Sequence, residues 1–163
     1  MGSTAFYQGL KLAVFDVTDV NHPVEMFKTI IGDRGTDSEV LHNHKALLFD
    51  KEKGILSFPV TLMEVKNPVK ANSKNGVLEY GQFTFQGAYV YQFDLLKGFT
   101  LRGKITHLKD ADLLKAGQQY MNSSNAIKRI IFIKDTLYTI SKKMIKANDL
   151  ASLQEKNSLI LNP

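Results

Sequence analysis

The chain of 163 residues contains no cysteine, so it cannot form disulfides, bind a metal through thiolates or use a thiol nucleophile. It also has no run that approaches the ~18 apolar residues of a membrane-spanning helix. Its first residues, Met-Gly-Ser-Thr-Ala, lack the basic segment and apolar stretch of a signal peptide. The apolar fraction of 44% is ordinary for a globular protein, and the length suffices for one domain with its own core.

The net charge of +5 indicates a basic chain, but no nucleic-acid recognition motif accompanies the charge. Part of this charge falls late in the sequence, at Lys128, Arg129, Lys134, Lys142, Lys143 and Lys146. These side chains lie within and between predicted strands, where cations protect sheet edges and cover solvated faces. We therefore expect no nucleic-acid partner.

An internal repeat is the most informative pattern in the sequence. Residues 7–17 and 85–95 both carry an aromatic residue, Gln and Gly, then an apolar strand, then Phe-Asp and an aliphatic residue. Residues 145–150 form a weaker third copy. A second pair, residues 45–58 and 128–140, consists of two apolar strands joined by a charged turn. Repeated strand units indicate a stacked or radial array, in which one unit cannot bury its own faces.

Ten strands are predicted from apolar runs bounded by turn-forming residues. They cover residues 10–17, 25–31, 45–50, 55–65, 80–95, 99–108, 127–133, 137–141, 144–150 and 158–161. The strand 80–95 is long and is expected to bend or bulge at Gln86-Gly87. Residues 110–119 are the one good helix candidate.

This order predicts an all-β fold, a partial β-propeller with about two and a half four-stranded antiparallel blades. Strands such as 46–49 and 130–133 are apolar on both faces, which is typical of sheets stacked on both sides. The single domain, 1–163, would divide into a half blade at 8–31 and full blades at 45–108 and 127–161. The half blade would supply the third and fourth strands of a meander. A single ten-stranded β-sandwich is the alternative.

Several segments carry a family resemblance. They are residues 30–39 with the motif Gly-Asp-Arg-Gly-Thr, then 44–48, 58–60, 87–91, 101–107 and 137–141. Over roughly residues 8–160, the chain resembles the secreted bacterial and archaeal proteins that carry a C-terminal β-propeller domain. The resemblance implies a propeller on an extracellular or surface-attached protein, and it supplies no substrate and no catalytic residues.

The chain departs from that family in its length. A propeller ring needs at least ~4 blades, more than the repeat predicts here. We therefore expect the chain to be the C-terminal piece of a longer protein, or to self-associate so that copies cover the open blade faces.

The polar segment 33–44 is the best candidate for a site, because it would join one blade to the next on one face of the propeller. The candidate residues are Asp33, Arg34, Asp37, Glu39, His42 and His44, with His107 after the corresponding strand of the next blade. Carboxylates and imidazoles in such a group can hold a divalent metal. In the structural alternative, Asp33 and Arg34 pair with each other or with backbone, and Gly35 permits a tight turn. We prefer this alternative and expect no cofactor, with a divalent metal as the open possibility.

Two other patterns are assigned to structure. Asp16, Asp94 and Asp149 end equivalent strands and are expected to accept backbone hydrogen bonds from the following turns. An aromatic stripe at period two consists of Phe83, Phe85, Tyr89, Tyr91 and Phe93. Such a stripe can stack against sugar rings, but aromatic residues inside strands fit packing between blades better.

These patterns favour a noncatalytic binding or scaffold module, with an unknown protein or glycan as the ligand of the propeller face. Ser38, His42 and Asp37 supply the residue types of a hydrolytic triad, yet no Gly-x-Ser-x-Gly elbow surrounds the serine. The alternative function is a metal-assisted hydrolase or lyase. Its site would use Asp33, Asp37, Glu39, His42 and His44.

Overall fold

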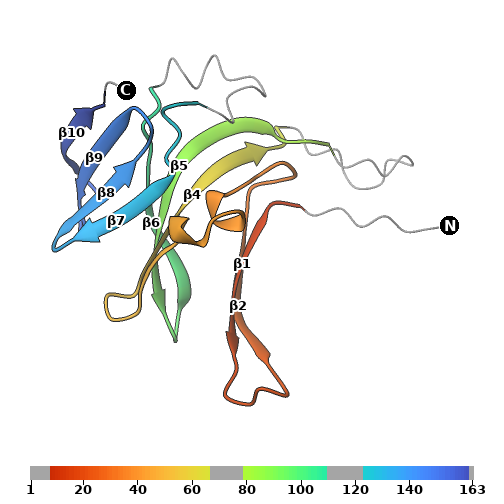
Figure 1. The fold of residues 1–163 in the computed structure, drawn as a ribbon. Helices are drawn as coiled ribbons and strands as arrows, with labels where there is room; N and C mark the ends of the chain where they lie inside the picture. Colours follow the sequence, from red (N-terminus) through yellow and green to blue (C-terminus); the bar gives the residue numbers. More distant parts are fainter. Residues whose placement is uncertain (1–7, 67–78, 110–122, 162–163) are drawn as a thin grey trace.

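The computed structural model describes residues 8–66, 79–109 and 123–161, which form three antiparallel sheets (Figure 1). The first is a hairpin of β1 (Leu10–Asp16) and β2 (Val24–Ile31). The second, the central sheet, contains β3 (Leu48–Asp50), β4 (Ile55–Glu64), β5 (Gln82–Asp94) and β6 (Gly98–Ile105). The third contains β7 (Arg129–Ile133), β8 (Thr136–Ile140), β9 (Met144–Asp149) and β10 (Glu155–Ile160). Two 3-10 turns, η1 (Glu39–Leu41) and η2 (His44–Ala46), precede β3.

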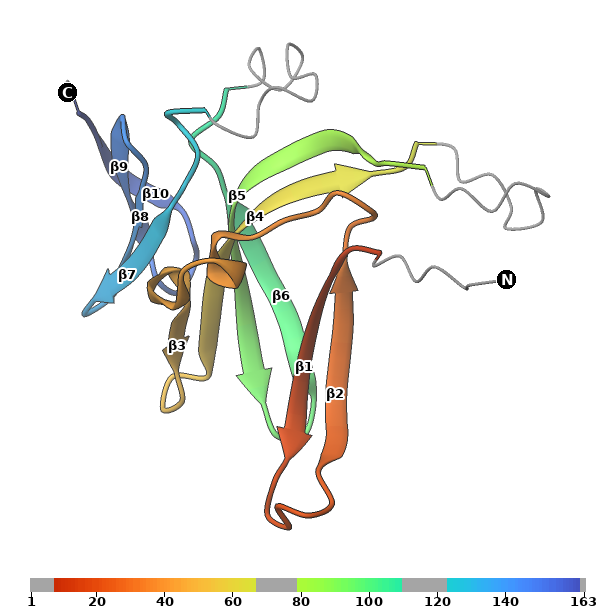
Figure 2. The same cartoon turned by 45° about the vertical axis from the view of Figure 1, so that its right-hand side comes forward.

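The sheets follow one another in chain order. The β1–β2 hairpin stands on one side of the central sheet and the third sheet on the other (Figures 1 and 2). Each four-stranded sheet is a meander in which strands adjacent in sequence pair. This arrangement confirms the predicted all-β fold built as part of a propeller, and it differs from a single sandwich. The helix candidate at 110–119 lies outside the described residues.

Within residues 8–66, 79–109 and 123–161, no helix has the length and apolar character needed to cross a membrane.

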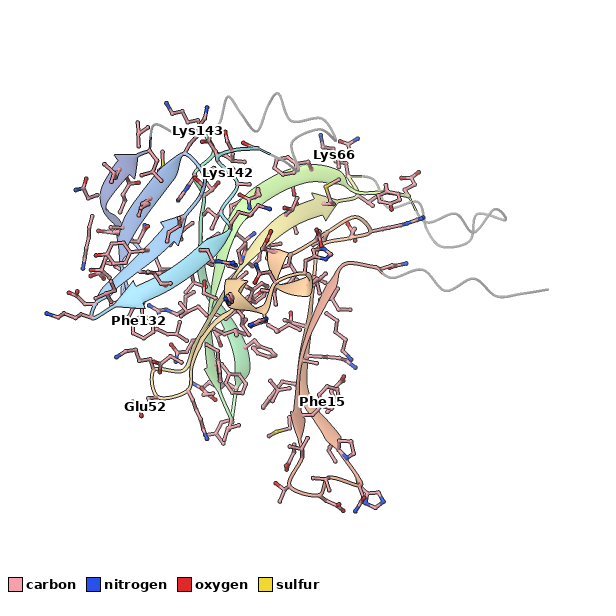
Figure 3. The ribbon with its side chains drawn as sticks, viewed as in Figure 1. Phe15, Glu52, Lys66, Phe132, Lys142 and Lys143 are labelled. Atoms are coloured by element: carbon pink, nitrogen blue, oxygen red, sulfur yellow. The ribbon has the colours of Figure 1, made fainter. Side chains whose placement is uncertain are left out.

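The central sheet buries one face against the third sheet. Ile55 and Val90 contribute from the central sheet, and Ile127, Ile130 and Leu137 from the third sheet and its leading segment. Full burial of a large aliphatic side chain stabilises a fold by about 1.5–3 kcal/mol, so this cluster is a main source of stability. At the rim of the same interface Phe132, labelled in Figure 3, lies 5.8 Å from the Nζ of Lys53 in the β3–β4 turn.

The opposite face of the central sheet packs against the hairpin. Leu10, Leu12 and Ile31 lie against a cluster that includes Phe58 and Tyr91, whose rings stack with centroids 6.1 Å apart. The hairpin also covers the first residue of β6. There Gly98 has φ +70°, and a Cβ at this position would lie 2.6 Å from the ring of Phe27. Glycine is therefore required at residue 98 both by the backbone and by the ring above it.

Burial on both faces of a strand occurs in β4, where every residue but two is buried. The sequence assigned this pattern to 46–49 and 130–133, and that assignment is wrong at Phe49, Ile131 and Ile133, which are exposed. The central sheet has a neighbour on each side, whereas the far face of β7 has none among the described residues. A strand that is apolar on both faces is thus buried only where two sheets flank it.

The sequence predicted a bend or a bulge at Gln86-Gly87 in β5; the register shows no bulge there, and the strand is curved (Figures 1 and 2). Its register shifts instead opposite Leu62 and Met63, and again between Val90 and Tyr91. Gln86 is buried, and its side-chain amide donates to the Ile127 carbonyl at 3.1 Å and accepts from the Ile127 amide at 3.0 Å. The repeated glutamine therefore joins the central sheet to the start of the next sheet.

Gln86→Ala should lower the free energy of unfolding by about 2 kcal/mol or more, because it leaves the buried N–H and C=O of Ile127 without their partner. Urea unfolding of the two proteins measures the difference. Gln92→Ala is the matched control, since Gln92 makes one exposed hydrogen bond to Lys53, and we expect a loss of at most ~0.5 kcal/mol. Equal losses in the two variants would show that the Gln86 bridge does not link the sheets energetically.

Candidate functional site

The segment 33–44 leaves β2, follows the edge of β4 and reaches β3 through η1 and η2 (Figure 1). Figure 3 shows Lys66, Lys142 and Lys143 at one end of the sheets and Glu52 in a hairpin turn at the opposite end. We call the surface that segment 33–44 forms between the β1–β2 hairpin and β3 the connection face. The segment thus joins the hairpin to the central sheet.

The first half of the segment is bonded along the free edge of β4. The Asp33 amide donates to the Met63 carbonyl at 2.8 Å, and its Oδ2 accepts from the Val65 amide at 2.7 Å. Asp37 and Thr61 exchange backbone hydrogen bonds of 3.0 and 2.8 Å. The carboxylate of Asp33 is therefore used by the fold, as the structural alternative predicted.

Two hydroxyl groups, to which the sequence assigned no structural role, complete this edge. Thr36 Oγ1 donates to the Met63 carbonyl and accepts from the Met63 amide, both at 3.1 Å. Ser38 Oγ donates to the carbonyl of Pro59. Both side chains are buried. Nothing in their sequence spacing reveals this role, because the strand that they bond lies more than twenty residues away.

Gly35 and Arg34 form the tight turn of the segment. Gly35 has φ +101°, and a Cβ there would lie 3.0 Å from the ring of Tyr80. The Arg34 guanidinium lies over the same ring, with Cζ 4.4 Å from its centroid, and the Arg34 carbonyl accepts from the Gly81 amide. The predicted tight turn is confirmed, and the structure gives Arg34 an aromatic partner that the sequence did not indicate.

The remaining candidates of the segment divide between an ion pair and the exposed surface. Glu39 Oε2 lies 2.7 Å from Lys128 Nζ and so ties η1 to the segment before β7. Asp37 Oδ1 and His42 Nε2 are 3.6 Å apart, and both side chains are exposed. His44 begins η2 and is exposed as well. Asp37, His42 and His44 thus remain accessible at the connection face.

His107 lies in a different environment. It is 4% exposed, with Nδ1 3.0 Å from Ser141 Oγ and Nε2 2.8 Å from Thr139 Oγ1. Burial lowers the pKa of His107 to about 4; the charge of Lys146 lowers it further, and Glu155 opposes the shift. The imidazole is therefore neutral at pH 7, and it does not join the exposed Asp37 and His42.

Among the described residues, no three His, Asp or Glu side chains gather in a way that could hold a metal ion. Within segment 33–44, the other contacts of the carboxylates keep them from gathering into such a group. Asp33 is bonded to the Val65 amide and Glu39 to Lys128, which leaves Asp37 with His42 as the closest pair.

The other sequence interpretations concern structural residues. Asp16 accepts from the Thr18 amide at 2.8 Å, Asp94 from two amides at 2.8 and 2.6 Å, and Asp149 from two amides at 3.1 and 2.9 Å. These bonds confirm the predicted role of the three aspartates. The pKa of each carboxyl group is lowered, at Asp16 mainly by the Thr18 hydroxyl and then by the Thr18 amide, and at Asp94 and Asp149 mainly by the backbone amides. Tyr89 and Tyr91 are buried, so this part of the aromatic stripe is core; burial raises the pKa of Tyr91 to about 12.

An apolar groove of about 400 Å³ lies between β1 and the central sheet. Leu10, Leu12 and Val14 line it from β1, and Phe49 and Phe99 line it from the central sheet. Sequence reasoning did not identify this groove. The predicted half blade, which supplies only the third and fourth strands of a meander, is consistent with an uncovered side of β1.

The geometry of repeated meanders packed face to face agrees with a comparison of the sequence with known families. The profile of the family described as Beta propeller domain matches residues 1–153. The chain belongs to the β-propeller domain family. Neither the curated proteins nor the solved structures gave a match.

The buried His107 predicts a pH dependence of stability for this β-propeller chain. The unfolded state takes up a proton as the pH falls through about 6.5, whereas the folded state does so only near 4. Stability that is present above pH 6.5 is therefore lost between pH 6.5 and 4, by up to roughly 3 kcal/mol. Thermal unfolding across this range should show the loss.

His107→Gln should be less stable than the parent at pH 7 but should show a flatter slope between pH 6.5 and 4. His42→Gln, at an exposed position, should keep the slope of the parent. Parallel slopes for the parent and His107→Gln would contradict the assignment.

Proposed function

We propose that this β-propeller chain is a noncatalytic binding or scaffold module of a secreted or surface-attached protein, with the connection face as its contact surface. Membership of the β-propeller family supports an interaction or scaffold role. The extracellular setting rests on the resemblance of segments such as 30–39 to secreted bacterial and archaeal proteins.

One observation carries the proposal: the polar groups of segment 33–44 are mostly bonded within the fold. Asp33, Thr36 and Ser38 bond the backbone of β4 and the residue that follows it, and Glu39 pairs with Lys128. These bonds occupy the groups within the fold and hold them in place. They make the segment rigid, and a rigid backbone with exposed side chains is what a recognition surface requires.

The exposed side chains of the segment indicate the kind of ligand. Asp37, His42 and His44 are polar, and Leu41 beside them is exposed. Interfaces between proteins combine an apolar centre with a polar rim, and polar side chains can also form hydrogen bonds with the hydroxyl groups of a glycan. We propose a protein or a glycan as the ligand of the connection face.

The second candidate function is a metal-assisted hydrolase or lyase. The observation in its favour is the Asp37–His42 pair, whose two facing groups are exposed and 3.6 Å apart. A metal held there would need further ligands from the solvent or the substrate.

Single substitutions distinguish the two functions. Arg34→Ala should lower the free energy of unfolding by about 1 kcal/mol, because it removes the guanidinium from the face of Tyr80. Asp37→Ala and His42→Ala should change it little, since both side chains are exposed. Thermal unfolding of the parent and the variants measures these effects, first without metal and then with Zn²⁺ or Mn²⁺.

The scaffold proposal expects the same melting temperature with and without metal. A metal-dependent rise that Asp37→Ala or His42→Ala abolishes would overturn it in favour of a metal site. Arg34→Lys is the control for charge, because it keeps a cation near Tyr80 without the planar guanidinium.

A further inference from the structure

We infer that the groove beside β1 is a docking site for a β-hairpin of the blade repeat carried by a partner polypeptide. The hairpin would pair with the free edge of β1 and cover the apolar side chains that line the groove. The inference rests on the proposed role of the chain as an interaction module, and it names the chemistry of one partner.

The free edge of β1 is the first argument. In the internal repeat, residues 9–16 correspond to residues 87–94 of β5. The strand β5 pairs with β4 on one edge and β6 on the other, and β9 likewise pairs on both edges. β1 pairs with β2 alone among the described residues. One edge of β1 therefore presents backbone donors and acceptors at the spacing of a strand.

The chain also contains a filled version of the same groove, at the interface between the central sheet and the third sheet. In the second repeat, Leu47 and Phe49 correspond to Ile130 and Phe132. Ile130 is 2% exposed and Phe132 is partly buried, whereas Leu47 is 42% and Phe49 is 51% exposed. Equivalent side chains are thus covered in one interface and open in the other.

The β3–β4 hairpin provides the cover in the filled interface. Leu48 and Ile55 belong to the cluster that includes Ile130 and has Phe132 packed against it. No counterpart of β3–β4 precedes β1 among the described residues. The group that would cover Leu47 and Phe49 is therefore a hairpin with apolar residues at the positions of Leu48 and Ile55.

The chemistry of the groove favours a strand over a small apolar ligand. Its lining is almost wholly apolar, with Lys11 and Ser38 as the polar members. A small ligand would fill the volume and leave the backbone groups of β1 unpaired. A strand offers apolar side chains at every second residue together with main-chain donors and acceptors. It can therefore cover the apolar lining of the groove and also pair with the backbone of β1.

The test uses a synthetic peptide with the sequence of residues 45–62 of this chain, extended by terminal lysines for solubility and labelled for fluorescence anisotropy. The peptide should bind the full chain saturably. In hydrogen exchange, its binding should slow alternate amides of β1. A peptide carrying Leu48→Asp and Ile55→Asp should bind at least tenfold more weakly.

Variants of the chain locate the binding. Phe49→Asp should weaken binding at least tenfold, and its exposed position makes it tolerable to the fold. Leu159→Asp on β10 is the matched control, since Leu159 is 60% exposed on an outer strand far from β1 in sequence, and it should bind like the parent. The double variant Asp37→Ala/His42→Ala should also bind the peptide. A failure of the proposed ligand binding at the connection face can therefore be distinguished from a failure of the proposed hairpin docking in the groove.

Several outcomes would overturn the inference. One is the absence of saturable binding to the folded chain, and another is binding that survives Phe49→Asp. Sedimentation that shows a dimer dissociated by Phe49→Asp would assign the groove to a second copy of the chain. Binding of an apolar dye that the peptide cannot displace would assign it to a small ligand.

Discussion

The central sheet must be covered on both faces, and the rest of the structure depends on this requirement. Ile55 and Val90 project to one side, and Phe58 and Tyr91 project to the other. A single layer with apolar side chains on both faces cannot be stable in water, so each face needs a neighbouring sheet. The third sheet meets this need fully on one side. The β1–β2 hairpin meets it only in part on the other, and the groove is the uncovered remainder.

The same requirement explains why the connection between the hairpin and the central sheet is so closely bonded. β3 has only three residues, and so it pairs with the first part of β4 alone. Residues 33–38 take over beyond that point and satisfy the backbone of β4 as far as Val65. Pro59 is tolerated in β4 because its neighbour at this edge, Ser38, donates to the Pro59 carbonyl and needs no N–H from the proline. The polar residues 33–38, which the sequence indicated as a candidate site, thus serve largely to complete the edge of the central sheet.

The sequence predicted ten strands and a two-stranded N-terminal unit, because apolar alternation and turn residues are local signals. It placed the start of β3 too early, since Asn43 accepts from the Lys45 amide and begins a 3-10 turn there. It also predicted a bend or a bulge at Gln86-Gly87, but not the hydrogen bond from the Gln86 amide to Ile127, forty-one residues later. Hydrogen-bond partners that are distant in sequence depend on how the sheets stack, which local sequence patterns do not record.

For the candidate site, the sequence identified the segment and the role of Gly35, but it could not separate bonded from exposed side chains. Asp33 and Asp37 are alike in sequence, yet one accepts from the Val65 amide and the other faces solvent beside His42. His107 was grouped with these residues because it follows an equivalent strand. Its burial against Thr139 and Ser141 follows from the packing of the third sheet, which no local pattern records.

The pairing of strands only with their sequence neighbours has a consequence for how the chain reaches and leaves its folded state. Each meander can form from short-range contacts, and each sheet then offers a face on which the next can order. Folding is expected to spread outward from the central sheet, which touches both of the others. A pulling force applied at the N-terminus would first detach β1 and β2, since one sheet face and Phe27 over Gly98 are their main attachments. The two four-stranded sheets would yield later, as a separate unit with its own force.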